Sequence, residues 1–105
     1  MTMSKKTNQD IKQLRTIGHK LKPAVTIAGN GLTYSVKAEL ERALNDHELI
    51  KIKLAVGSRE ARSAVAQEVC SATRAQLVQS IGNVLLIVRR SAKPDPRLSN
   101  LIRPQ

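Results

Sequence analysis

The feature that most constrains this chain is a run of five apolar residues near its end, Val-Leu-Leu-Ile-Val at 84–88. It follows a Gly-Asn pair at 82–83 and another β-type stretch at 77–81. Two such stretches joined by two turn residues predict a β-hairpin. A strand that is apolar at every position is normally covered on both faces of its sheet. The chain must therefore supply helices for both faces.

Apolar residues recur at helical spacing in three segments, which predicts helices at about 4–17, 33–46 and 58–73. Ser4, Thr33 and Ser58 are expected to cap these helices, because their hydroxyl groups can accept hydrogen bonds from first-turn amides. Gly18 is expected to end the first helix. The apolar face of the third helix is expected to consist of Ala61, Ala64, Val65, Val69 and Cys70.

Further strands are predicted at 24–28 and 49–56, and in the latter Ile50, Ile52 and Leu54 alternate with Lys51 and Lys53. Strands joined through helices are usually parallel, whereas the final hairpin is antiparallel. The predicted fold is a compact α-β-α-β-α-β-β domain of the α/β (α+β) class, with a four-stranded mixed sheet, in residues 1–90.

Residues 91–105 hold three of the four prolines and show no periodicity. They are predicted to form a mostly disordered basic tail. Leu98, Leu101 and Ile102 are the residues of this tail that could dock on the domain.

The charge of the chain predicts an anionic partner. Lys and Arg number 18 against 8 Asp and Glu, which gives a net charge of +10 and favours nucleic acid ahead of a membrane. Residues 26–50 carry two basic and four acidic residues, so a basic surface must come from the two ends of the sequence. Tyr34 is the one aromatic residue. This excludes domains that stack bases on aromatic platforms, such as RNA-recognition motifs and OB folds.

Other chemistries find little support in the sequence. Cys70 is the one cysteine, which excludes an internal disulfide, and it is expected to be a small core residue. His19 and His47 have no nucleophile or carboxylate at a recognisable spacing, so neither catalysis nor a metal site nor a cofactor is expected. No membrane span or secretory signal is recognisable. We therefore expect a cytoplasmic monomer without a membrane or small-molecule partner.

A glycine-bearing turn at Gly29-Asn30-Gly31 opens the second predicted helix. Free amides at a helix N-terminus can bind a phosphate, and a plain strand-to-helix turn is the alternative. Cations near helix N-termini oppose the helix dipole, and a bound phosphate would reverse that penalty. The alternative is that these cations are solvated side chains, whose unfavourable interaction with the helix dipole is screened by salt. The cations in question are Lys37, Arg59 and Arg62.

A further group of cations lies on the predicted strands and on the connector before them. Lys51 and Lys53 share one strand face, Lys20 and Lys22 line the connector, and Arg89 closes the last strand. A solvated sheet face whose lysines discourage aggregation is the alternative. Because the net charge of +10 calls for a partner, phosphate binding is favoured.

Three segments carry a resemblance to a known family: LKPAVTIAGNGLT at 21–33, HELIKIKL at 47–54 and QSIGNVLLIVRR at 79–90. Over about residues 5–90 the chain resembles the CRM domain (chloroplast RNA splicing and ribosome maturation), in particular the small bacterial YhbY-like proteins. The resemblance implies a domain that binds structured RNA and is similar in fold to the C-terminal domain of translation initiation factor three. Bacterial members associate with precursors of the large ribosomal subunit.

The family carries a GxxG loop, likened to that of KH domains, which falls on residues 28–31. Ala28 stands here in place of the first glycine. Asn83 replaces a frequent lysine, Val88 a frequent tyrosine, and Arg74 stands near a glycine that commonly closes the third helix.

The sequence thus predicts a non-catalytic protein that binds ribosomal RNA of large-subunit precursors. A DNA-binding or nucleoid protein is one alternative. The other is a protein-interaction module that docks through its acidic second helix, with Glu39, Glu41, Asp46 and Glu48. The residues expected to contact RNA are Lys20, Lys22, Ala28, Gly29, Asn30, Gly31, Thr33, Lys37, Lys51, Lys53, Arg59, Arg62 and Arg89.

Overall fold

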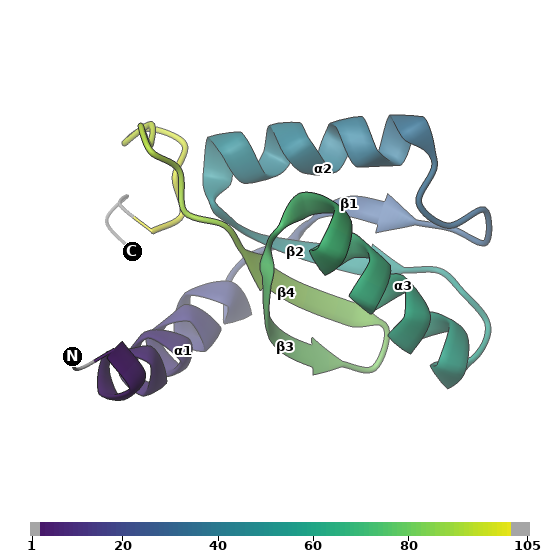
Figure 1. Ribbon diagram of the computed structural model, residues 1–105, viewed down its shortest axis with the longest axis horizontal. Helices are drawn as coiled ribbons and strands as arrows, with labels where there is room; N and C mark the ends of the chain where they lie inside the picture. The colour runs from purple at the N-terminus through teal and green to yellow at the C-terminus, as the bar shows by residue number, and fades with distance from the viewer. Residues whose placement is uncertain (1–2, 102–105) are drawn as a thin grey trace.

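The computed structural model describes residues 3–101, and side chains from residue 11 onward. The predicted order of helices and strands is confirmed (Figure 1). The elements are α1 (Met3–His19), β1 (Pro23–Ile27), α2 (Tyr34–His47), β2 (Leu49–Leu54), α3 (Arg59–Thr73), β3 (Gln76–Ile81) and β4 (Val84–Val88). The hydroxyl groups of Thr33 and Ser58 cap α2 and α3 as predicted. The predicted cap position at Ser4 is wrong, because α1 begins at Met3 and Ser4 lies within the helix; its side chain is outside the described ones.

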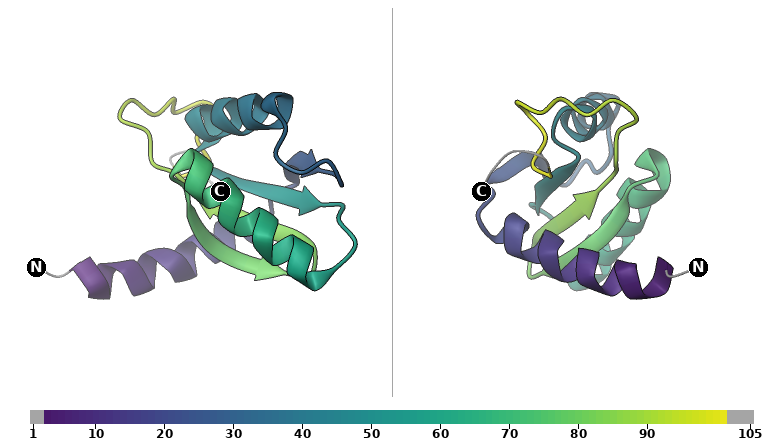
Figure 2. Two further views of the ribbon diagram at one scale, coloured as in Figure 1. Left: turned by 45° about the vertical axis from the view of Figure 1, so that its right-hand side comes forward. Right: turned by 90° about the vertical axis from the view of Figure 1, so that its left-hand side faces the viewer.

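The four strands form one mixed sheet, as predicted, and the structure places them in the order β1-β2-β4-β3. β1 and β2 pair in parallel, whereas β4 pairs antiparallel with both β2 and β3. β4 therefore occupies an inner position and is covered on both faces. Helices α2 and α3 lie on one side of the sheet and α1 lies on the other (Figures 1 and 2).

Two hydrophobic clusters fill the space between the helices and the sheet. Leu85 and Ile87 point to the side of α2 and α3, whereas Leu86 and Val88 point to α1, as the alternation of side chains along a strand requires. The larger cluster includes Val25, Ile27, Leu40, Leu44, Ile50, Ile52, Leu54, Val69, Leu85 and Ile87. The smaller one consists of Leu14, Ile17, Leu49, Val78, Leu86 and Val88, with Ile11, Leu21 and Leu101 packed against it.

The prediction that Gly18 ends the first helix is wrong, because α1 continues to His19. A Cβ atom at Gly18 would lie 2.4 Å from Cδ2 of Leu86, a buried side chain of β4. Glycine therefore serves close packing at this position: it lets the end of α1 approach the sheet.

The predicted apolar face of α3 is confirmed in part, since Val65 and Cys70 pack against the larger cluster. Val69 is buried as expected, but Ala64 is exposed and Ala66 and Thr73 are buried instead. The hydroxyl group of Thr73 donates to the carbonyl of Val69 at 2.7 Å. This hydrogen bond allows a polar residue to occupy a core position that hydrophobicity alone would not assign to it.

The carboxy-terminal segment 91–101 differs from the disordered tail expected from the sequence. It lies along the end of α2 (Figure 1), and Ser99 and Asn100 are buried. The buried carboxylate of Glu48 accepts hydrogen bonds from the Ser91 amide and the Ser99 hydroxyl group, both at 2.5 Å. The Asn100 side chain donates to the carbonyl of Leu49 at 2.6 Å.

Two contacts of His47 complete the docking of this segment. Its carbonyl accepts from the Asn100 amide at 2.9 Å, and its Nδ1 lies 2.9 Å from the carbonyl of Leu98. Hydrogen bonds to polar groups therefore dock this segment on the domain. Because such contacts need no hydrophobic periodicity, the sequence pattern does not reveal them. Leu101 packs against the smaller cluster, whereas Ile102 lies outside the described residues.

We predict that Gly18→Ala lowers the free energy of unfolding by about 1–2 kcal/mol. Alanine favours a helix interior by about 1 kcal/mol. Forcing a methyl group against buried Leu86 costs more, on the order of 1–3 kcal/mol. Urea unfolding measures the difference. Gly57→Ala is the matched control, since nothing lies within 4 Å of a Cβ atom there. Equal stability of the two variants would contradict the close-packing role.

Candidate nucleic-acid interface

The glycine turn between β1 and α2 uses some of its amides internally and leaves others free. The Gly31 amide donates to the carbonyl of Ala28 at 2.9 Å, and the Thr33 amide donates to the carbonyl of Gly31 at 3.0 Å. Within residues 3–101, the amides of Gly29, Asn30 and Leu32 have no hydrogen-bond acceptor. These three groups, at the N-terminus of α2, are available to an anion.

The backbone of the turn requires glycine at one position. Gly31 has a φ of +75°, in the left-handed region that disfavours residues with a Cβ atom. Ala28 is not among the residues with positive φ, so alanine fits there without backbone strain. The departure from the family pattern at Ala28 therefore leaves the turn intact. A Cβ atom at Gly29 would meet nothing within 4 Å, which shows that the outer side of the turn is open.

Four lysines, Lys20, Lys22, Lys51 and Lys53, form what we call the basic face. Lys51 and Lys53 point from β2 to the side of the sheet that α1 covers only in part, and Lys20 and Lys22 lie on the connector between α1 and β1. Lys51 and Lys22 line one hollow, and Lys51 and His19 line another. Lys53 is exposed and pairs in register with Thr26, three residues before Gly29. In the described part of the chain, no ion pair holds any of these four ammonium groups. They are available to anionic ligands.

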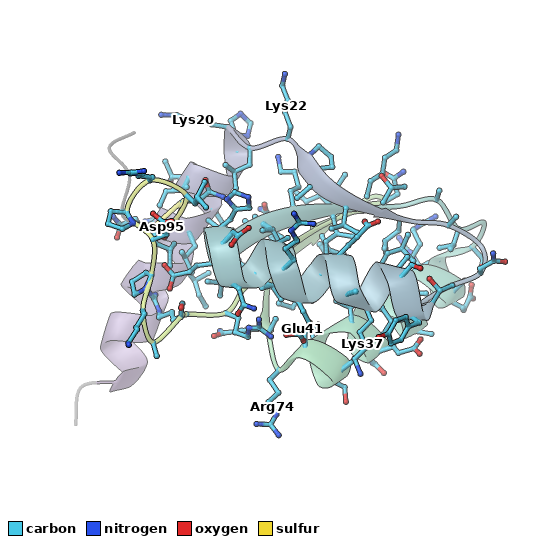
Figure 3. All side chains as sticks on the ribbon, turned by 90° about the horizontal axis from the view of Figure 1, so that it is seen from above. Lys20, Lys22, Lys37, Glu41, Arg74 and Asp95 are labelled. Carbon is cyan, nitrogen blue, oxygen red and sulfur yellow. The ribbon has the colours of Figure 1, made fainter. Side chains whose placement is uncertain are left out.

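Three other predicted cations lie elsewhere. Arg59 and Arg62 line a hollow of about 490 Å³ between α3 and β3, on the opposite side of the sheet from α1. Lys37 lies on the side of α2 nearer α3, whereas Lys20 and Lys22 extend from the opposite side of the molecule (Figure 3). The structure therefore divides the cations predicted from the sequence between two surfaces.

Arg89 has a structural environment that the sequence did not predict. Its side chain is 22% exposed, and Nη1 donates to Glu41 Oε1 and to the carbonyl of Thr73, both at 2.9 Å. Nη2 donates to Asn45 Oδ1 at 3.0 Å. The guanidinium group thereby joins the middle of α2 to the end of α3. Its donors are used within the protein, which leaves it poorly placed for a phosphate.

These contacts also reduce the acidic surface of α2. Glu41 pairs with Arg89, and the carboxylate of Glu48 is buried against the carboxy-terminal segment. Lys37 lies one helical turn before Glu41, but within the described residues the ion pair of Glu41 is with Arg89. Of the four acidic residues that the protein-docking alternative relied on, Glu39 and Asp46 remain without an internal role in the described residues.

The described residues give little sign of other chemistry. Burial raises the pKa of the Cys70 thiol, which keeps it protonated at neutral pH and agrees with the predicted packing role. No cluster of three or more potential metal ligands occurs between residues 3 and 101. Over the same residues, the helices are too short or too polar to span a membrane.

The chain is similar to known proteins in both sequence and fold. The sequence model of the CRS1 / YhbY (CRM) domain family matches residues 7–89. The chain belongs to this family. The protein named "Probable RNA-binding protein PA4753", from Pseudomonas aeruginosa, is 54% identical over 97 residues, which cover 92% of this chain and 93% of the relative. An RNA-binding protein of Haemophilus influenzae is 44% identical over 90 residues, covering 86% and 88% respectively.

The fold is also shared with a solved structure. The solution structure of SAV1595 from Staphylococcus aureus matches with a TM-score of 0.72 at 27% identity. The match covers 81% of this chain and 88% of that chain. The family resemblance recognised from the three sequence segments is thus confirmed, and the arrangement of three helices and four strands is that of a known fold.

Some residues at this surface were not predicted from the sequence. His19, Gln79 and Ile81 lie beside Lys51 in one hollow, although they come from opposite ends of the chain. The register of β3 shifts between Leu77 and Gln79, which is what brings Gln79 and Ile81 to this side. The alternation of polar and apolar residues along the sequence does not predict where such a register shift occurs.

We predict that Arg89→Met lowers the free energy of unfolding by about 2 kcal/mol, because it removes charge-assisted hydrogen bonds and leaves the Thr73 carbonyl without its donor. Arg89→Lys should lose a similar amount, since a single ammonium group cannot bridge the same acceptors. Lys93→Met, at an exposed position, is the control. Unchanged stability of Arg89→Met in chemical denaturation would show that the arginine is free for a ligand.

Proposed function

We propose that this protein binds RNA without catalysing a reaction, and that its target is ribosomal RNA in precursors of the large ribosomal subunit. The observation that carries the proposal is the set of unpaired donors formed by the basic face and, beyond the end of β1, by the free amides of the glycine turn. The two close relatives named as RNA-binding proteins support the partner class. The family resemblance of the sequence supports the ribosomal target.

The basic face supplies the electrostatic part of binding. Each lysine that neutralises a phosphate releases counterions, which stabilises the complex and makes it sensitive to salt. Lys51 and Lys53 point to the same side of β2, two residues apart, so they can contact neighbouring parts of one RNA backbone. Lys20 and Lys22 extend this surface beyond the edge of the sheet, as Figure 3 shows.

The glycine turn supplies the directional part. Amides at a helix N-terminus point at an anion, and the helix dipole strengthens their interaction. Since phosphate contacts position a protein without reading sequence, we infer that recognition depends mainly on the shape of a structured RNA. Tyr34 is 89% exposed beside the turn, and the chain has no phenylalanine, tryptophan or second tyrosine that could stack on a base.

The double variant Lys51→Gln, Lys53→Gln tests the basic face. We expect it to reduce the slope of log K against log salt by about 1–2 units, since each phosphate contact contributes roughly 0.7–0.9. Fluorescence anisotropy with a structured RNA at several salt concentrations gives the slope. The matched control is Arg74→Gln, Lys93→Gln, which removes the same net charge from exposed positions elsewhere.

An equal change of slope in both double variants would mean that net charge alone controls binding, and would remove the basic face from the site. Duplex DNA is measured under the same conditions. Binding to DNA as tight as to structured RNA would favour the DNA-binding alternative.

The glycine turn is tested by Asn30→Asp, which places a carboxylate where a phosphate is expected. We predict about fivefold weaker RNA binding, equivalent to about 1 kcal/mol, because repulsion replaces part of the attraction at the helix N-terminus. Asn30→Gln keeps the charge and should bind like the original protein. Gln76→Glu makes the same charge change at an exposed position of β3. If Gln76→Glu weakened binding as much as Asn30→Asp, the turn would have no special role.

A further inference from the structure

A hollow of about 210 Å³ lies between the end of α1 and the side of the sheet that carries the basic face. Two rows of side chains that cross the sheet define its position. In one row, Lys51 of β2 pairs with Leu86 of β4, which pairs with Gln79 of β3. In the next row, Lys53 pairs with Val84, which pairs with Ile81.

The end of α1 limits the hollow on one side. Gly18 lies directly against Leu86, so the helix comes close to the first row and then stops after His19. Beyond this point the sheet is uncovered, and Ile81 is 64% exposed. The hollow therefore has an apolar floor made by Leu86 and Val84, an apolar wall at Ile81, and His19 at its edge.

The bulge in β3 gives this hollow its polar group. Val78 packs into the cluster beneath α1, and Gln79, the next residue, lines the hollow on the same side of the sheet. Two successive residues on one side of a strand are what a register shift produces. In the described part of the chain, the Gln79 amide makes no hydrogen bond to the protein.

These groups together match a nucleobase. A base has two flat apolar faces, which can contact the side chains of Val84, Leu86 and Ile81. Its edge carries hydrogen-bond donors and acceptors, and the amide of Gln79 can both donate to this edge and accept from it. An imidazole ring such as His19 can stack on a base. Lys51 at one end of the hollow and Lys53 beside it can hold the flanking phosphates.

We propose that this hollow receives a single unpaired nucleobase of the bound RNA. The inference rests on the proposed function and extends it, because it names the preferred substrate as a structured RNA with a bulged nucleotide at the site of contact. The charge of the surroundings favours a nucleotide over a protein side chain: the apolar hollow is flanked by lysines that no ion pair holds in the described residues.

The experiment compares two RNA hairpins of equal stem length, one with a single bulged nucleotide and one fully paired. The bulged nucleotide is 2-aminopurine, whose fluorescence rises when it leaves the stack. We expect the bulged hairpin to bind about tenfold more tightly, in line with the contribution of one base held against a protein surface. Its fluorescence should rise on binding.

Two variants in the hollow and one matched control locate the effect. Gln79→Met keeps the side-chain length but removes the amide, and Ile81→Thr keeps the β-branch but removes apolar contact. Both should bring the preference for the bulged hairpin to threefold or less and leave binding of the paired hairpin unchanged. Leu77→Thr removes another exposed apolar residue, from the opposite side of β3, and should keep the full preference.

Equal binding of both hairpins by the unaltered protein, or an unchanged preference in both hollow variants, would overturn the inference and leave the proposed function standing. Failure to bind either hairpin would overturn the proposed function itself. Thermal unfolding of each variant confirms that it is folded, and the exposure of Ile81 and Leu77 makes large losses of stability unexpected.

Discussion

The packing of α1 against β4 determines how much of the sheet is left for a ligand. Leu86 and Val88 are buried under α1, and the absence of a side chain at Gly18 allows the helix backbone to reach Leu86. The chain then turns away into β1, so one helix covers only part of this side. The remaining surface carries Lys51 and Lys53, since polar residues alternate with the core residues of β2. The burial that stabilises the fold and the surface proposed to bind RNA are therefore consequences of one packing arrangement.

Internal polar contacts then decide which charged groups remain available. Arg89 pairs with Glu41, and Glu48 accepts hydrogen bonds from the carboxy-terminal segment. These three charged side chains therefore stabilise the fold and are not available to a ligand. The basic face has no such partners in the described residues. Part of the net positive charge is thereby left on the basic face, at the edge of the sheet formed by β1 and β2.

The sequence predicted those features that depend on neighbouring residues. Thr33 caps α2, Gly82-Asn83 forms the hairpin turn, and the alternation around Lys51 identifies a strand with one polar side. Features that join distant parts of the chain were not predictable in this way. The contact of Arg89 with Glu41 spans 48 residues, and the contact of Ser99 with Glu48 spans 51. Neither is marked by periodicity, and the same holds for the register shift that places Gln79 beside His19.

The central claim is that ribosomal RNA lies on the basic face and the glycine turn. Ultraviolet crosslinking in living cells, with both the attached RNA and the modified peptides identified, tests it most directly. We predict that the RNA comes from precursors of the large ribosomal subunit and that nucleotides are attached to peptides within residues 19–33, 51–53 and 79–84. Crosslinks confined to α2 and α3, or RNA without ribosomal sequences, would contradict the account.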